Sequence, residues 1–180
     1  MIIRPATFED VPMMLAIAAE GSAESRFAGL FDAKRTLEYL ETYLAWDDAE
    51  IIVATKTVGP DNEGFDQTKE YRRYTVDRRH SFVERILGGV ILVRAYEMWS
   101  QPICYIVKFW IGRHGRRTSA SRRLIKAVDD WAIKHECLAI YATATGELSD
   151  REQNLFENMM TKTGYLNVGP TLKKRITTYE

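Results

Sequence analysis

The chain has 180 residues, 46% of them hydrophobic and 28% charged, with a net charge of zero. This size and composition are typical of a single domain spanning residues 1–180, and they exclude intrinsic disorder and fibrous folds. Two cysteines are too few for a disulfide scaffold or a cysteine-based zinc site, and no apolar run approaches the roughly 18 residues of a membrane span. With no signal-peptide pattern, we expect a cytoplasmic protein without a membrane partner, whose cysteines act as small hydrophobes.

Helical and extended patterns alternate in the first part of the chain. Gly21 and Ser22 are expected to end the first helix, and Asp32 is a candidate N-cap of the second. In chain order, the apolar spacing predicts a strand at 2–4, helices over 8–20 and 33–45, and a buried strand at 51–55.

The stretch of about 57–82 breaks this pattern. Turn-forming residues open it at Gly59, and almost no apolar periodicity follows before His80, so we interpret it as a polar insertion. Its mixture of aromatic and basic groups suits stacking on bases and pairing with phosphate. A long surface loop explains the same composition. Nucleic acid is the less favoured partner, because the chain has no overall basic excess.

The second part of the chain predicts the centre of a sheet. The run 86–94 is apolar at both odd and even positions, which is typical of a central strand covered on both faces. Ser149, with Glu152 three residues later, is a candidate capping box for the last helix. We predict strands at 86–94, 103–111, 137–144, 166–168 and 172–178, and helices over 122–135 and 150–162.

The charges are unevenly distributed along the chain. Residues 1–66 carry 5 basic and 13 acidic side chains, whereas residues 67–180 carry 20 basic and 12 acidic ones. The segment 108–126 holds seven basic residues and no acidic one, and it includes the loop between strand 103–111 and the following helix. This loop therefore predicts a site for a small polyanion, with a solvated basic helix face as the alternative.

A helix N-terminus presents unpaired backbone amides and the positive end of the helix dipole, so a loop of small residues there lets a phosphate approach closely. Thr118–Ser121 is such a loop, and the neighbouring arginines can form charge-assisted hydrogen bonds with phosphate oxygens. The glycine spacing of P-loops and dinucleotide sites is absent. The flanking arginines are Arg116, Arg117, Arg122 and Arg123.

The run Arg116–Ser121 follows the strand that ends at Ile111 and places an arginine three and five residues before two small residues at a helix start. With the opening Ile3–Asp10 and the late Lys162–Tyr165, this arrangement resembles the GNAT superfamily of acyl-CoA N-acyltransferases over nearly the whole chain. The resemblance implies an α/β (α+β) fold with a mixed, mostly antiparallel sheet of about six or seven strands. About four helices would flank it, and the fourth and fifth strands would splay in a V.

The same resemblance implies acetyl-CoA as co-substrate and no metal. Its pantetheine arm would lie between residues 107–111 and 138–143, and its pyrophosphate on the amides of 117–122. A primary amine would attack the thioester directly in a ternary complex. The implied cofactor-binding residues are Phe109, Trp110, Ile111, Arg116, Arg117, Thr118, Ser119, Ala120, Ser121, Arg122 and Asn154.

An attacking amine must lose a proton, so the site needs a general base, directly or through water. Tyr105 stands where some family members place a glutamate base, but an ordinary tyrosine pKa near 10 suits it better to orienting substrate. Glu97 is the alternative carboxylate and Glu84 a weaker one. Each of these side chains has a structural alternative as an ordinary packed or surface residue.

Three positions depart from the family pattern. Ser119 and Ser121 stand where glycine or alanine is usual, and Met160 stands where a tyrosine often protonates the departing thiolate. Such losses resemble divergent branches, some of them phage-encoded. They favour, as alternatives, a catalytically degenerate binding or regulatory protein, or a nucleic-acid-modifying protein that uses the basic insertion. The sequence leaves the acceptor open and is compatible with a homodimer.

Overall fold

The computed structural model describes residues 1–24, 29–58, 83–97, 100–143, 150–167 and 171–175. The insertion expected at about 57–82 and the capping box expected at Ser149 therefore lie almost wholly outside the described residues. Within them, the elements in chain order are β1 (Ile2–Pro5), the 3-10 helix η1 (Phe8–Asp10), α1 (Val11–Glu24), α2 (Ala33–Ala45), β2 (Ala49–Val58), β3 (Val83–Ala95), β4 (Ile103–Ile111), the 3-10 helix η3 (Arg113–Gly115), α3 (Ala120–Lys134), β5 (Ala139–Thr143), α4 (Asp150–Lys162), β6 (Leu166–Asn167) and β7 (Thr171–Arg175).

The order of elements predicted from the sequence is confirmed, and one helix end is corrected. The Asp32 side chain accepts a hydrogen bond of 3.0 Å from the amide of Arg35, so it caps α2 as expected. The prediction that Gly21 and Ser22 end α1 is wrong, because the helix continues to Glu24. A glycine inside a helix costs only about 1 kcal/mol relative to alanine, which the packing of the rest of α1 outweighs.

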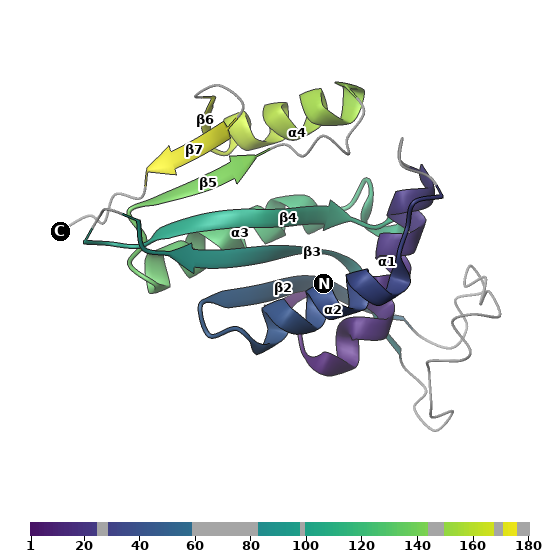
Figure 1. The fold of residues 1–180 in the computed structure, drawn as a ribbon. Helices are drawn as coiled ribbons and strands as arrows, with labels where there is room; N and C mark the ends of the chain where they lie inside the picture. The colour runs from purple at the N-terminus through teal and green to yellow at the C-terminus, as the bar shows by residue number, and fades with distance from the viewer. Residues whose placement is uncertain (25–28, 59–82, 98–99, 144–149, 168–170, 176–180) are drawn as a thin grey trace.

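The described strands form one sheet in the order β1-β2-β3-β4-β5-β7-β6 (Figure 1). Neighbours in this sheet pair antiparallel except β4 and β5, which are parallel. The mixed, mostly antiparallel sheet expected from the sequence is thus confirmed. The parallel pair lies near the middle of the sheet, where the chain passes from β4 through α3 to β5.

A bulge in β4 sets where the two parallel strands separate. Ile91 pairs with Lys108 and Leu92 with Ile106, so Val107 is an extra residue on β4. The pairing of β4 with β5 ends at Ile106 and Ala142, one residue before β5 ends at Thr143, whereas β4 continues to Ile111. An extra residue bends a strand and increases its twist, which turns the last part of β4 away from β5. This is the splay predicted between the fourth and fifth strands.

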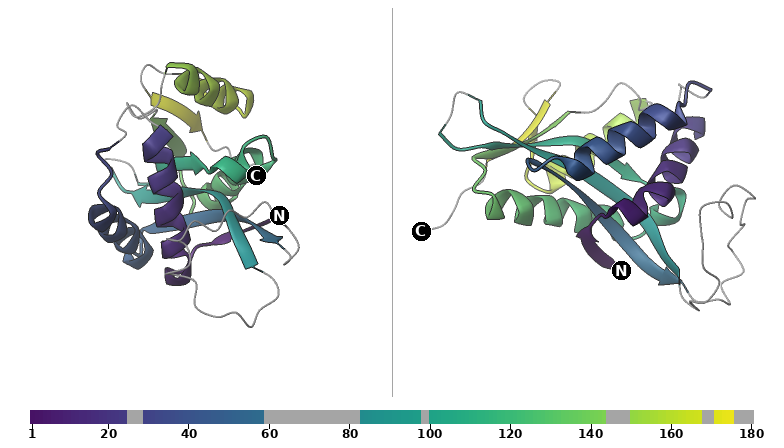
Figure 2. Two further views of the ribbon diagram at one scale, coloured as in Figure 1. Left: turned by 90° about the vertical axis from the view of Figure 1, so that its right-hand side faces the viewer. Right: turned by 60° about the horizontal axis from the view of Figure 1, so that its bottom comes forward.

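Two helical layers cover the sheet (Figure 2). On one face, α3 and α4 bury a core that includes Leu124, Val128 and Met160. On the other, α1 and α2 bury a second core that includes Met14 and Leu40. The two sets of strand residues beneath these cores alternate along β2 and along Val90–Leu92 of β3, as a two-residue repeat requires, and an extra residue at Leu87 shifts the alternation earlier in β3.

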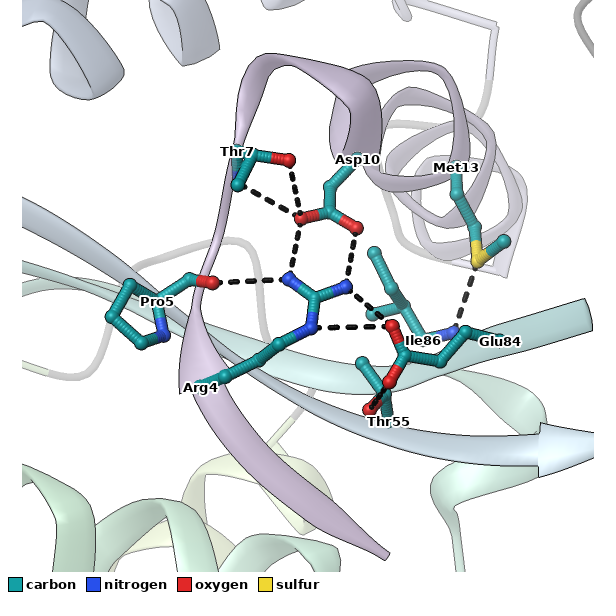
Figure 3. Close-up of polar contacts among 8 residues, drawn as sticks. All are labelled: Arg4, Pro5, Thr7, Asp10, Met13, Thr55, Glu84 and Ile86. Atoms are coloured by element: carbon teal, nitrogen blue, oxygen red, sulfur yellow. Dashed lines mark hydrogen bonds and ion pairs between the residues drawn. The ribbon is translucent and has the colours of Figure 1, made fainter.

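At the β1 edge of the sheet, Arg4 joins three elements through its guanidinium (Figure 3). Two of its nitrogens lie 2.8 and 2.9 Å from the two carboxylate oxygens of Asp10, next to the first turn of α1. A third contact of 2.6 Å reaches Glu84 on β3, which also accepts a hydrogen bond of 2.8 Å from Thr55 on β2. The network fixes the opening turn of the chain against β2 and β3.

These contacts shift the acidity of both carboxylates in the same direction. Burial raises the pKa of Asp10, but its hydrogen bonds from Arg4 and Thr7 outweigh burial, so the net pKa lies below its usual value. The hydrogen bond from Arg4 also holds the pKa of Glu84 below its usual value. Both groups therefore stabilise the folded state at neutral pH and lose that contribution as they become protonated in acid.

We predict that Arg4→Gln lowers the free energy of unfolding by about 1–3 kcal/mol at pH 7, because it removes charge-assisted hydrogen bonds from two partly buried carboxylates. The difference between the variant and the wild type should shrink as the pH falls below about 5, through the lowered pKa values of Asp10 and Glu84. Urea unfolding across this range measures it. Arg35→Gln, which breaks an exposed pair with Asp32, is the matched control and should cost less than about 1 kcal/mol. A difference independent of pH would contradict the prediction.

Candidate functional site

The loop from β4 to α3 is held close against β3. The Gly112 amide donates a hydrogen bond of 2.9 Å to the carbonyl oxygen of Leu87. At Gly115, a Cβ atom would lie only 2.1 Å from that same oxygen, so a side chain there would force the loop away from the strand. This close approach joins the loop to Leu87 of β3, 28 residues earlier in the chain, so only the folded chain shows it.

Thr118 closes the loop onto the start of α3. Its hydroxyl donates a hydrogen bond of 2.6 Å to the carbonyl oxygen of Gly115 and accepts one of 3.1 Å from the amide of Ala120. Arg117, just before it, has a φ of +62°, in the left-handed region that non-glycine residues rarely adopt. A left-handed residue followed by a helix start turns successive amides towards one side, which is the geometry of anion-binding nests.

The amides at this turn fit a bound anion. Among the described residues, no hydrogen bond uses the amides of Arg117, Ser119, Ser121 and Arg122, which precede or begin α3. They add to the positive end of the α3 dipole. Ser119 is exposed and forms no side-chain cap, and its hydroxyl donates a long hydrogen bond of 3.9 Å to the sulfur of Met1.

The arginines around the loop have different surroundings. Arg117 and Arg122 are exposed at its tip. Arg116 forms an ion pair with Glu24 at the end of α1, and Arg123 donates a hydrogen bond of 3.0 Å to the carbonyl oxygen of Met1. The sequence predicted the arginines but not the Glu24 carboxylate beside Arg116, because the two residues are 92 positions apart.

Beyond the bulge, the side chains of β4 point to alternating faces. Phe109 and Ile111 pack against the core beneath α3 and α4, and Phe109 lies 6.1 Å from Phe156 of α4 between ring centroids. Trp110 packs instead against the core beneath α1 and α2. Of the three residues expected at the cofactor, the structure therefore brings two to the α4 side and sends the side chain of Trp110 to the opposite face.

The candidate base residues Tyr105 and Glu97 lie together. The Tyr105 hydroxyl donates a hydrogen bond to a carboxylate oxygen of Glu97, and its ring stacks on Tyr141 of β5 with centroids 5.6 Å apart. Burial, with this hydrogen bond, raises the pKa of Tyr105 to about 12. The hydroxyl is therefore protonated at neutral pH and does not act as a base there.

The third carboxylate candidate is engaged elsewhere. Glu84 belongs to the Arg4 network, and its lowered pKa makes it a weaker base than an ordinary carboxylate. In the loop itself, burial and the nearby Arg85 lower the pKa of His114, so its imidazole adds little charge at pH 7.

On α4, the residues expected from the family pattern are spread over both sides of the helix. Asn154 is exposed, and the adjacent Gln153 donates a hydrogen bond of 3.1 Å to Glu157. Met160 is fully buried in the core beneath α3. Tyr165 is buried as well, and burial raises the pKa of its hydroxyl, so it does not replace the missing acid at the Met160 position.

Two grooves lie among the described residues. One, of about 490 Å³, runs between β1 and α3 past Ile3 and Lys126 and is lined in part by Arg123, one of the arginines that flank the loop. The other, of about 240 Å³, lies beyond the C-terminal end of α3 beside Arg94 and His135. No helix in the described parts of the chain is both long and apolar enough to cross a membrane.

Comparison with known proteins places these features in a family context. Residues 38–160 match the model of the acetyltransferase (GNAT) family. No curated protein sequence matches the chain. One similar solved structure is a probable acetyltransferase, with 13% identity and a TM-score of 0.62 over 100% of this chain and 96% of that one. Another is AAC(6')-Iy in complex with the bisubstrate analogue CoA-S-monomethyl-acetylneamine, with 14% identity and a TM-score of 0.61 over 99% of this chain and 96% of that one. A third is a ribosomal-protein-alanine N-acetyltransferase from Brucella melitensis biovar Abortus 2308, with 15% identity and a TM-score of 0.56 over 88% of this chain and 91% of that one. At these identities the structural likeness establishes the fold.

The hydroxyl of Thr118 gives a direct test of the loop geometry. We predict that Thr118→Val lowers the free energy of unfolding by about 1–2 kcal/mol, because the Ala120 amide and the Gly115 carbonyl lose their partner. Thr118→Ser keeps the hydroxyl and should cost less than half as much. Thermal and urea unfolding measure both. A larger loss in Thr118→Ser than in Thr118→Val would show that the methyl group, not the hydroxyl, carries the stabilisation.

Proposed function

Because the chain belongs to the GNAT acetyltransferase family, we propose that it transfers the acetyl group of acetyl-CoA to a primary amine. The observation that carries the proposal is the turn into α3, where available amides and exposed arginines gather beside a splayed strand. Backbone amides at a helix start, with arginine side chains around them, are suited to a pyrophosphate. The similar structures solved with CoA or a CoA analogue support the same cofactor.

The proposed cofactor binds at two places, the turn into α3 and the last part of β4. The pyrophosphate binds the amides of Arg117, Ser119 and Arg122, and the side chains of Arg116, Arg117 and Arg122 neutralise its charge. The pantetheine arm lies along residues 107–111 of β4, which β5 does not pair with, so that strand amides are available to it. Asn154 on α4 contacts the pantetheine or the adenine, as the family pattern implies.

Transfer requires a short list of chemical events. The neutral amine attacks the thioester carbon, the C–N bond forms, the C–S bond breaks and CoA leaves as a thiolate, while the amine nitrogen gives up a proton. Strand amides near the bulge stabilise the negative charge on the carbonyl oxygen. Met160 is buried and has no proton to give, so the thiolate takes its proton from water; a thiol pKa near 8.5 makes it a tolerable leaving group.

Tyr105 and Glu97 stand on the acceptor side of this site. With its raised pKa, Tyr105 remains a hydrogen-bond donor and orients Glu97, and the carboxylate takes the amine proton through water or binds the acceptor. The two roles are separated by experiment below. A protein that binds CoA without turnover is the second candidate function, which the buried Met160 favours; acetyl-CoA binding without thiol release in any amine screen would select it.

We predict that acetyl-CoA binds with a low-micromolar Kd and that Arg122→Ala weakens it about tenfold or more, by removing a charge-assisted contact with phosphate. Arg117→Ala should act in the same direction. Titration calorimetry measures both. Lys126→Ala is the matched control, because Lys126 is an exposed cation one turn further along α3 that pairs with Asp130. No binding at millimolar acetyl-CoA would reject the proposed function.

Glu24 gives a prediction of opposite sign. Its carboxylate forms an ion pair with Arg116, so the cofactor must displace the carboxylate before that arginine can bind phosphate. We predict that Glu24→Gln tightens CoA binding about two- to fivefold, because an exposed ion pair of up to about 1 kcal/mol no longer competes. Glu20→Gln, one turn earlier on α1, controls for the general loss of negative charge. Weaker binding in Glu24→Gln would mean that the pair holds the loop in its binding shape.

A further inference from the structure

Tyr105 and Tyr141 form an aromatic pair on the sheet that belongs to neither hydrophobic core. Tyr105 and Tyr141 are directly opposite each other in the β4–β5 register. Their neighbours along both strands point into the core beneath α3 and α4, so the two tyrosines face the other side. There, α1 and α2 pack over β2 and β3, and neither tyrosine belongs to the core beneath those helices (Figure 1). The stacked rings are half-buried and border solvent.

A negative charge lies at the edge of this pair. Glu97 is exposed and accepts the hydrogen bond of Tyr105, whose hydroxyl stays protonated at neutral pH. Two aromatic faces beside a carboxylate form a surface suited to an organic cation, through the ring quadrupoles and a charge-assisted hydrogen bond. Such a surface does not suit the anionic cofactor, which is expected at the arginine loop.

The Tyr105–Tyr141 pair also lies next to the point where the pairing of β4 with β5 ends. Tyr105 immediately precedes Ile106, the last residue of β4 that pairs with β5. The aromatic pair is therefore at the closed end of the splay, on the face opposite the one that Phe109 and Ile111 share with α4. An acceptor that binds the tyrosines approaches the splay from the side that the cofactor leaves open, given the proposed function on which this step rests.

The charge near Glu97 decides which nitrogen of an acceptor it binds. A carboxylate beside an ammonium stabilises the charged form, whereas the attacking amine must be neutral. Glu97 thus suits a cationic group other than the one that reacts. We propose that Tyr105, Tyr141 and Glu97 form a subsite for a second ammonium group of the acceptor, and that the acetyl acceptor is an aliphatic amine with at least two positive charges.

The charges around this face are of both signs, and the test addresses the basic ones. The helices beside the face carry exposed acidic residues, among them Glu20, Glu38 and Glu41, but α2 also carries exposed Lys34, which lies 3.8 Å from Glu38, and exposed Arg35. Lys108 lies on the same face as the tyrosines, because it pairs with Ile91, which points into the core beneath α1 and α2. An acceptor that bound Lys108 instead would carry a carboxylate.

Three probes of similar length separate these possibilities: 1,4-diaminobutane, n-butylamine and 4-aminobutyrate. They are titrated into the protein with and without CoA at low salt. We expect the diamine to bind about tenfold or more tightly than butylamine, Glu97→Gln to remove that difference, and Tyr141→Leu to reduce it. Glu38→Gln, an exposed carboxylate of α2, should leave it unchanged. Equal affinities, absence of diamine binding, or tighter binding of 4-aminobutyrate would each overturn the proposal.

Steady-state release of CoA thiol separates a binding role of Glu97 from proton removal. If Glu97 binds the second ammonium, Glu97→Gln raises KM for the diamine about tenfold, with kcat and the butylamine reaction little changed. A loss of kcat for both amines alike, with a shifted pH profile, would overturn the proposal and make Glu97 the proton acceptor. Failure of the proposed function can be told apart from failure of this proposal. The first would appear as absence of acetyl-CoA binding, whereas the diamine titration without CoA tests the subsite by itself.

Discussion

The extra residue in β4 is the feature on which the candidate site depends. Because Val107 has no partner in β3, β4 bends there and the side chains beyond it change faces, and the pairing of β4 with β5 ends next to the bulge, at Ile106. Phe109 then faces α4, whereas Tyr105, before the bulge, faces the opposite side. A sheet with continuous pairing would leave no strand amides available at its centre. The bulge therefore changes which face of the sheet the side chains on either side of it occupy, and the proposed cofactor and acceptor sites lie on those two faces.

The distribution of charge follows the same division. The acidic first part of the chain forms the helices on one face, and the basic segment forms the turn into α3, where a phosphate is best held. The two parts meet at the ion pair between Glu24 and Arg116, and Arg116 belongs to the proposed phosphate site. A net charge of zero thus hides a molecule with two electrostatic sides. An anionic co-substrate and a cationic acceptor would each be attracted to its own side.

The sequence predicted the elements that local patterns specify strongly. The bounds of α2 and β4 agree with the prediction to the residue, because a capping aspartate opens α2 and a continuous apolar run defines β4. The loop Arg116–Ser121 was recognisable because its motif is contiguous. The end of α1 was predicted wrongly, since Gly21 signals a helix stop that packing overrides. Thr118 was predicted only as a cofactor-binding residue, and the structure adds a role for its hydroxyl within the loop.

The sequence by itself determined the order of helices and strands, the family, the basic loop at a helix start and the uneven charge, because each depends on residues that are close together in the chain. Only the tertiary structure decided which distant residues meet: Glu24 with Arg116, Glu84 with Arg4, and Tyr105 with Tyr141. It also decided where β4 leaves β5. Strand register and side-chain partners arise from packing between segments far apart in sequence, and a single residue of register moves a side chain to the other face.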